Sequence, residues 1–209
     1  VDRSGASGIF LAIVRGGRYN EASEAKASGG MAVREEGFAG ADVAELRARI
    51  EAVRARIRQA AERSGRDPAT VRLLLATKTV SAARLRAAAL AGATAFGENR
   101  AQELRDKAPA LSDLEVEWHF IGHLQTNKVK DVLPYIRLLH SLDRPTLAEA
   151  LNRRLEREGR TLDVLLQVNT SGEESKFGVA PEAALPFYKE VVRLPALRVR
   201  GFMTIGAHT

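Results

Sequence analysis

Cysteine is absent from the 209-residue sequence. This absence excludes disulfide bonds, thiolate metal sites and a cysteine nucleophile. A chain without cysteine also fits the reducing cytoplasm, which is the location that we predict for it. Hydrophobic residues make up 45% of the chain and charged residues 28%, which is typical of a soluble globular protein and not of a disordered one.

Long apolar runs are missing as well. The stretch at 9–14, IFLAIV, is the one apolar run in the first 40 residues, and it is too short for a membrane span or a signal-peptide core. The same 40 residues hold 8 of the 17 glycines and show no periodic pattern. We therefore predict a disordered or wrongly annotated leader at 1–40, a folded domain at 41–209, and no association with membranes.

Lysine is scarce, although the chain is basic. The formal charge is +6, and only 7 of the 32 basic residues are lysines. Many arginines lie on a predicted helix over 42–64, where a basic face including Arg54, Arg56 and Arg58 could bind nucleic acid. The same segment has apolar residues three and four positions apart, which indicates an ordinary amphipathic helix with a solvated arginine face. These apolar residues are Val43, Leu46, Ile50, Val53 and Ile57.

From residue 42 onward, apolar strand patterns alternate with amphipathic helix patterns. Asp42 and Glu45 resemble a capping box at the start of the first helix, and Ser81 is placed to cap the second. The predicted strands cover 71–77, 94–97, 116–122, 136–143, 162–169 and 199–206. The predicted helices cover 42–64, 81–92, 101–108, 126–135, 143–159 and 181–194. This alternation predicts βαβ units and a parallel sheet.

A doubly wound sheet and a (β/α)₈ barrel both fit this alternation. No Gly-x-Gly-x-x-Gly follows the first strand, as a dinucleotide-binding fold would need. Polar residues stand instead at the carboxyl ends of most strands, where barrel enzymes keep their chemistry. They are Lys78, Glu98, Asn99, His123, Asp143 and Asn169. We therefore predict a (β/α)₈ barrel of which about six strands are present, with open edges at the first and the last strand.

Lys78 is the most informative of these polar residues. It follows the apolar run Val71–Ala76, which suits a strand buried on both faces. Lysine is among the residues least often buried, so an ordinary explanation is that the strand ends and the ammonium group reaches water. The motifs that follow in the chain favour a functional role.

Six motifs occur in a fixed order along the chain, at 73–79, 95–103, 117–130, 140–143, 165–179 and 201–206. They read LLLATKT, AFGENRAQE, EWHFIGHLQTNKVK, HSLD, LLQVNTSGEESKFGV and GFMTIG. In series they resemble the YggS/PROSC family, the pyridoxal phosphate homeostasis proteins, over about residues 42–206. The resemblance implies the alanine-racemase-type barrel, without the second domain that racemases carry.

The resemblance also implies a cofactor and a site. In the family, the lysine that ends the first strand holds pyridoxal 5′-phosphate (PLP) as an internal aldimine, and Lys78 matches it. Asn99 then lies beside the cofactor ring, and His119 and Met203 line the wall. The implied function is PLP binding in intracellular vitamin B6 homeostasis, with PLP-dependent apoenzymes as possible recipients and no dedicated catalytic turnover.

The chemistry of Lys78 is consistent with that role. A Schiff base requires a neutral amine, and partial desolvation at the rim of an apolar barrel lowers the pKa of a lysine. Family members continue past the sixth strand into two turns that hold the PLP phosphate, and these turns are absent here. We therefore expect this 209-residue chain to bind PLP weakly and to be a fragment of a longer protein.

Several alternatives stay open at this point. A PLP-dependent amino-acid racemase or a Schiff-base lyase could also use Lys78, although no tyrosine stands near a strand end to serve as a second proton-transfer group. A basic nucleic-acid-binding barrel is a third possibility. His119 and His123 would share one face of a strand, but without a third ligand we predict no metal site. The segment SGEESKFG lacks the spacing of a phosphate-binding loop, so we expect it to be a mobile loop over the barrel mouth.

Overall fold

The computed structural model describes residues 40–173 and 176–206. Six parallel strands form one sheet in the order β1-β2-β3-β4-β5-β6. Their bounds are β1 Leu75–Ala76, β2 Ala95–Glu98, β3 Glu117–Phe120, β4 Ile136–Leu142, β5 Leu162–Gln167 and β6 Leu197–Met203. Each strand pairs with the next one in the chain, as the predicted barrel requires and a doubly wound sheet would not show. The predicted partial barrel is therefore confirmed, and the leader predicted at 1–40 falls almost wholly outside the described residues.

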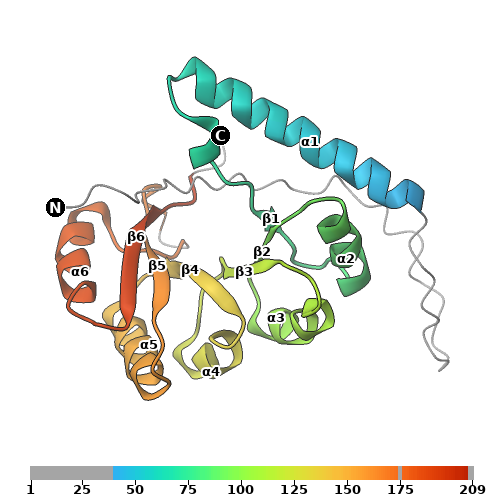
Figure 1. Cartoon of the computed structure of the whole chain (residues 1–209). Coiled ribbons are helices and arrows are strands. Elements are labelled where there is room, and N and C mark those ends of the chain that lie inside the picture. Colours follow the sequence, from blue (N-terminus) through green and yellow to red (C-terminus); the bar gives the residue numbers. More distant parts are fainter. Residues whose placement is uncertain (1–39, 174–175, 207–209) are drawn as a thin grey trace.

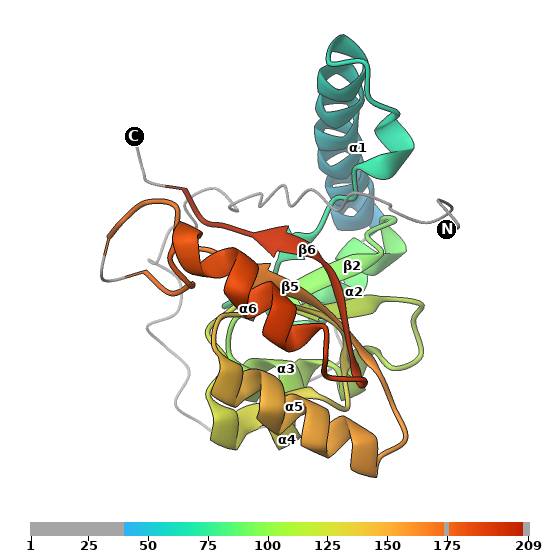
Figure 2. The ribbon, with the colours of Figure 1, turned by 90° about the vertical axis from the view of Figure 1, so that its left-hand side faces the viewer.

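Helices cover the convex side of the curved sheet (Figure 1). They are α1 Gly40–Arg63, α2 Ala82–Leu90, α3 Ala101–Lys107, α4 Val129–Val132, α5 Pro145–Arg157 and α6 Ala184–Val191. Short 3₁₀ turns lie at η2 Pro68–Thr70, η3 Pro109–Leu111, η4 Thr126–Lys128 and η5 Pro181–Ala183. Helices α2 to α6 follow the arc of strands, whereas α1 projects away from it (Figures 1 and 2). None of the described helices is long and apolar enough to cross a membrane.

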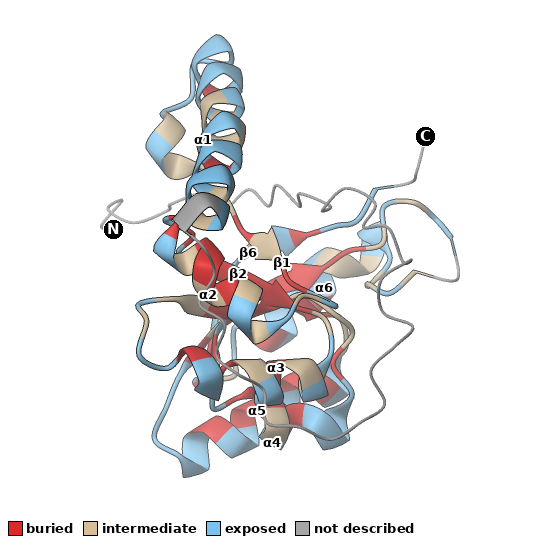
Figure 3. Ribbon diagram, turned by 90° about the vertical axis from the view of Figure 1, so that its right-hand side faces the viewer, coloured by how far each residue is buried: buried red, intermediate tan, exposed pale blue. Residues whose placement is uncertain are grey.

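The main core lies between the sheet and these helices. Phe96, Trp118, Phe120 and Leu139 point from the strands into this layer and are almost fully buried. Trp118 packs against Phe96 with ring centroids 5.5 Å apart, so the tryptophan is part of this core. Strands β2 to β5 are mostly buried, whereas most of α1 is exposed (Figure 3).

The concave face of the sheet carries a second, smaller set of side chains. Leu138, Leu165 and Met203 form a buried apolar cluster that is separate from the main core. Because side chains alternate between the two faces of a strand, His119 lies on the concave face between two residues of the main core, Trp118 and Phe120. The barrel interior is therefore partly apolar and partly polar.

Some predicted boundaries are wrong for physical reasons. The first strand, predicted over 71–77, pairs with β2 only over Leu75–Ala76. The helix predicted over 126–135 is a 3₁₀ turn followed by four α-helical residues, and Pro134 stands just past them, where it could not donate a helical hydrogen bond. Ser81 does cap α2, since its hydroxyl accepts a hydrogen bond from the amide of Arg84.

Helix α1 begins earlier than predicted. Asp42 lies in its first turn and is not the cap, although a carboxylate there still interacts favourably with the helix dipole. The predicted apolar stripe is confirmed, with Ile50 buried and its other members partly buried. Two arginines tie α1 to the end of α2: Arg47 donates to the carbonyl of Leu90, and Arg54 to that of Gly92. Arg54 is therefore not free to serve a nucleic acid face.

The edges of the sheet lead to a first prediction. Among the described residues, β1 and β6 each pair with one strand only. Unpaired strand edges are templates for association with other chains. We expect the isolated 209-residue polypeptide to self-associate, with a sedimentation coefficient that rises with protein concentration. A single monomeric species at all concentrations would contradict this expectation.

Candidate functional site

Polar side chains from successive strands meet at one rim of the sheet. Lys78 follows β1, Asn99 follows β2, His123 lies just past β3, Asp143 follows β4, and Asn169 lies just past β5. Because all strands are parallel, their carboxyl ends lie at the same edge. The structure therefore brings the predicted polar residues to one end of the partial barrel.

Lys78 occupies a tight turn directly after β1. It is exposed, while Thr77 before it is buried. Thr79 has φ +63°, and it is the one non-glycine residue with positive φ among those described. The left-handed conformation is unfavourable for a β-branched residue. Such strain persists where the surrounding structure holds the backbone in place, and it is often found at functional sites.

Asn99 is half-buried at the end of β2 and has an unused acceptor. Its Oδ1 atom is buried and has no hydrogen-bond partner among the described residues. An unpaired buried acceptor is costly, so this atom is a candidate contact for a bound ligand. The glycine of the β3 motif, Gly122, lies directly against the Asn99 backbone.

A pair of buried histidines lies inside the barrel. Nδ1 of His119 and Nε2 of His140 are 2.8 Å apart, and the rings are 5.1 Å apart. Burial lowers the pKa of His119 to about 4 despite the opposing influence of the Glu117 carboxylate, and burial lowers the pKa of His140 to about 3. Both rings are therefore neutral at pH 7.

The surroundings of the ring nitrogens favour one combination of tautomers for His119 and His140. Nε2 of His119 lies 3.5 Å from the Glu117 carboxylate and has no hydrogen-bond partner among the described residues. The nearby negative charge still favours a proton on that nitrogen, which leaves Nδ1 as the acceptor. His140 then donates from Nε2 and keeps its lone pair on Nδ1, an atom that is buried and unpartnered among the described residues. His140 was not among the residues predicted for the site, although it stands in the HSLD motif.

His123 is engaged separately from His119. Its Nδ1 atom is 3.1 Å from Asp143 Oδ2, and its ring stacks on Phe177 with centroids 3.9 Å apart. Arg144 also pairs with Asp143, at 2.6 Å. No group of three potential metal ligands occurs in the described part of the chain. The loop predicted over the mouth lies partly outside the described residues, but Phe177 within it contacts this rim.

The structure thus divides the four predicted site residues between two places. Lys78 and Asn99 lie at the rim, whereas His119 and Met203 are buried on the concave face. Met203 packs with Leu138 and Leu165, as a wall residue would. The nearest polar partner of His119 is His140 and not a residue of the rim.

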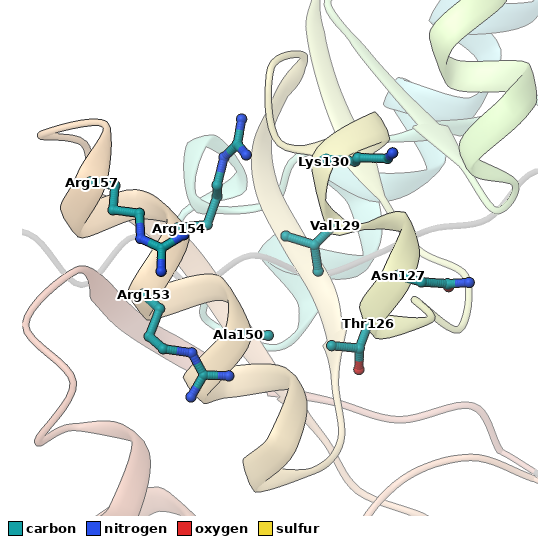
Figure 4. A pocket seen from close by; sticks show the side chains of 8 residues that line it. All are labelled: Thr126, Asn127, Val129, Lys130, Ala150, Arg153, Arg154 and Arg157. Atoms are coloured by element: carbon teal, nitrogen blue, oxygen red, sulfur yellow. The ribbon is translucent and has the colours of Figure 1, made fainter.

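Two surface cavities are found in the described part of the chain, one beside the rim and the other on the outside of the barrel. One, of about 370 Å³, is lined by the rim residues Asn99 and His123 together with residues of α3 and of the segment 124–131. The other, of about 250 Å³, lies between α4 and α5 (Figure 4). Its lining is basic, with Lys130, Arg153, Arg154 and Arg157 around Val129 and Ala150. Lys78 lines neither cavity.

Comparison with known proteins adds an independent line of evidence. Residues 48–209 match the family described as alanine racemase, N-terminal domain. A pyridoxal phosphate homeostasis protein of Aquifex aeolicus is 45% identical over 75% of this chain and 69% of its own length. One of Pseudomonas aeruginosa is 46% identical over 77% of this chain and 70% of its own length.

Two solved structures are similar to this chain in both fold and sequence. The crystal structure of an unknown protein from Bifidobacterium adolescentis superposes with a TM-score of 0.75 and 38% identity, over 82% of this chain and 74% of that one. PipY of Synechococcus elongatus with PLP bound superposes with a TM-score of 0.61 and 34% identity, over 71% of this chain and 68% of that one.

Proposed function

Because the chain belongs to the alanine racemase N-terminal domain family, and within it to the pyridoxal phosphate homeostasis proteins, we propose that it binds PLP and acts in intracellular PLP homeostasis. PLP is bound in PipY, a solved relative. The relatives by sequence bear the name of this function. We further propose that the protein works in the cytoplasm and hands PLP on to apoenzymes.

The observation that carries the proposal is the position of Lys78. PLP supplies an aldehyde that reacts with a neutral primary amine. Lys78 offers an exposed amine at the carboxyl end of β1, and its ammonium group forms no hydrogen bond or ion pair within the described part of the chain. This is the end of the strands at which barrel proteins bind their ligands.

The other three predicted site residues have properties that suit a ring-shaped polar ligand. Asn99 has a buried acceptor that no described residue satisfies, and a donor on the ligand would satisfy it. His119 is neutral, so it can contribute a fixed hydrogen-bonding wall without adding charge. Met203 supplies an apolar contact on the same concave face. We assign these three residues to cofactor binding and Lys78 to covalent attachment.

A holding role is favoured over turnover. Tyr135 precedes β4, at the opposite end of the strand from the rim, and Tyr188 lies on α6. Neither can serve as a second proton-transfer group facing Lys78, and two-base racemisation needs such a group. We therefore propose a PLP carrier without a dedicated substrate. If the PLP-loaded protein catalysed exchange of an amino acid's α-proton with solvent, the proposal of a carrier without a dedicated substrate would be contradicted.

The proposal is tested by equilibrium binding of PLP to the purified protein. We expect saturable binding with a change in the visible absorbance of PLP, and we expect Lys78→Ala to abolish the absorbance change. The control is Lys189→Met, which removes an exposed lysine of α6 and should leave binding unchanged. An equal absorbance change with Lys78→Ala would contradict the assignment.

A further inference from the structure

A second lysine lies beneath the turn that carries Lys78. The Nζ atom of Lys107, at the end of α3, donates hydrogen bonds to Glu98 Oε1 at 2.7 Å, to Glu103 Oε2 at 2.6 Å and to the carbonyl oxygen of Thr77 at 2.9 Å. Its side chain is only 11% exposed. Lys107 therefore links β2, α3 and the residue that precedes Lys78.

The same two carboxylates also contact the turn directly. The Thr77 hydroxyl donates to Glu98 Oε1 at 2.6 Å, and the Thr79 amide donates to Glu103 Oε2 at 2.9 Å. Burial raises the pKa of Glu103, but hydrogen bonds from Lys107 and Thr79 outweigh it and hold the pKa below its usual value. Glu103 is therefore ionised at pH 7, which strengthens both hydrogen bonds.

The turn needs support of this kind. Thr79 adopts φ +63°, a conformation that a threonine does not favour by itself. The turn is held on both sides of Lys78, at Thr77 and at Thr79, while the Lys78 side chain itself stays exposed. Restraints on both neighbours fix the direction in which the Lys78 side chain leaves the backbone.

We propose that Lys107 is a positioning residue for Lys78: bridged between Glu98 and Glu103, it locks the 77–79 turn so that the Lys78 amine is presented to PLP. This inference rests on the proposed function for its PLP part only. Lys107 is not itself the attachment point, because its ammonium group is committed to three acceptors, two of them carboxylates.

The first test requires no PLP. Hydrogen exchange at the Thr79 amide is compared in the wild type, Glu103→Ala and Lys107→Met, with Lys189→Met as the surface control. We expect exchange to accelerate by about tenfold or more in the first two variants, because the acceptor or its anchor is lost. Lys107→Arg keeps a cation that can donate to both carboxylates, and we expect it to restore slow exchange in large part.

The second test measures PLP binding with the same proteins. We expect Glu103→Ala to weaken PLP binding by about tenfold or more, since small errors of placement are costly for bond formation. The reactivity of Lys78 toward a small acylating reagent should stay at the wild-type level, because the amine remains exposed. Lys107→Met leaves the buried Glu98 carboxylate unpaired and can unfold, so Glu103→Ala is the primary variant.

The two tests separate the possible failures. Unchanged exchange at Thr79 in Glu103→Ala would overturn the inference whether or not PLP binds. Faster exchange with unchanged PLP binding would overturn the positioning role. If the wild type binds no PLP at Lys78, the proposed function fails and the positioning role fails with it, while the exchange result still decides whether Lys107 and Glu103 hold the turn.

Discussion

Gly122→Ala is expected to destabilise the protein by about 3 kcal/mol or more and to disturb Asn99. A Cβ atom at this position would lie 2.2 Å from the carbonyl oxygen of Asn99, 2.6 Å from its Cα and 2.7 Å from its carbonyl carbon. All three atoms belong to the backbone, so a side-chain rotation cannot relieve the clash. The β2–α3 connection must move away from the loop after β3.

The measurement for Gly122→Ala is urea unfolding together with PLP binding. Movement of the β2–α3 connection should lower the free energy of unfolding and also weaken PLP binding, because Asn99 in this connection is a proposed cofactor contact. Gly206→Ala is the matched control, since a Cβ there would meet nothing within 4 Å and its φ is not in the left-handed region. Wild-type stability of Gly122→Ala would mean that the two loops do not pack as the structure has them.

Acid is expected to destabilise the fold through the histidine pair. A free histidine has a pKa near 6.5, whereas burial holds that of His119 at about 4 and that of His140 at about 3. Between these values the unfolded state binds more protons than the folded state, so stability falls as the pH falls. When the pH falls from about 7.5 to 5.5, the two residues together should lower the free energy of unfolding by about 3 kcal/mol.

Variants identify the source of that acid sensitivity. His119→Gln/His140→Gln cannot take up these protons, so the difference between its unfolding free energies at the two pH values should be smaller than in the wild type by about 3 kcal/mol. His140→Gln alone should reduce this pH dependence of the unfolding free energy by about half as much as the double variant does. His123→Gln is the control, because it leaves both buried histidines in place. An equal pH dependence in the double variant and the wild type would contradict the neutral, buried pair.

Much of the fold was predictable because local patterns agreed with it. The alternation of strands and helices predicted the parallel sheet, and the polar residues at the strand ends favoured the sequential strand order of a barrel. Ser81 capped α2 as its position predicted. The strand-end position of Lys78 followed from the apolar run before it. Such features depend on neighbours in the chain, so the sequence displays them directly.

Features that depend on contacts between strands could not be predicted in the same way. The pairing of His119 with His140 involves two neighbouring strands whose register shifts between Trp118 and His119, and no local pattern marks such a shift. Similarly, the Lys107 network joins β2, α3 and the turn after β1. On α3 itself, Lys107 looks like an ordinary partner of Glu103 four residues earlier.

The central claim, that Lys78 is the residue that holds PLP, is tested most directly by reductive trapping. The protein is mixed with PLP and reduced with borohydride, and the modified residue is mapped by mass spectrometry. At a PLP concentration that saturates the expected weak binding, we expect stoichiometric modification at Lys78 in the wild type, with Lys107 unmodified, and no stoichiometric modification in Lys78→Ala. Modification scattered over the exposed lysines Lys128, Lys130 and Lys189, equally in both proteins, would contradict the claim.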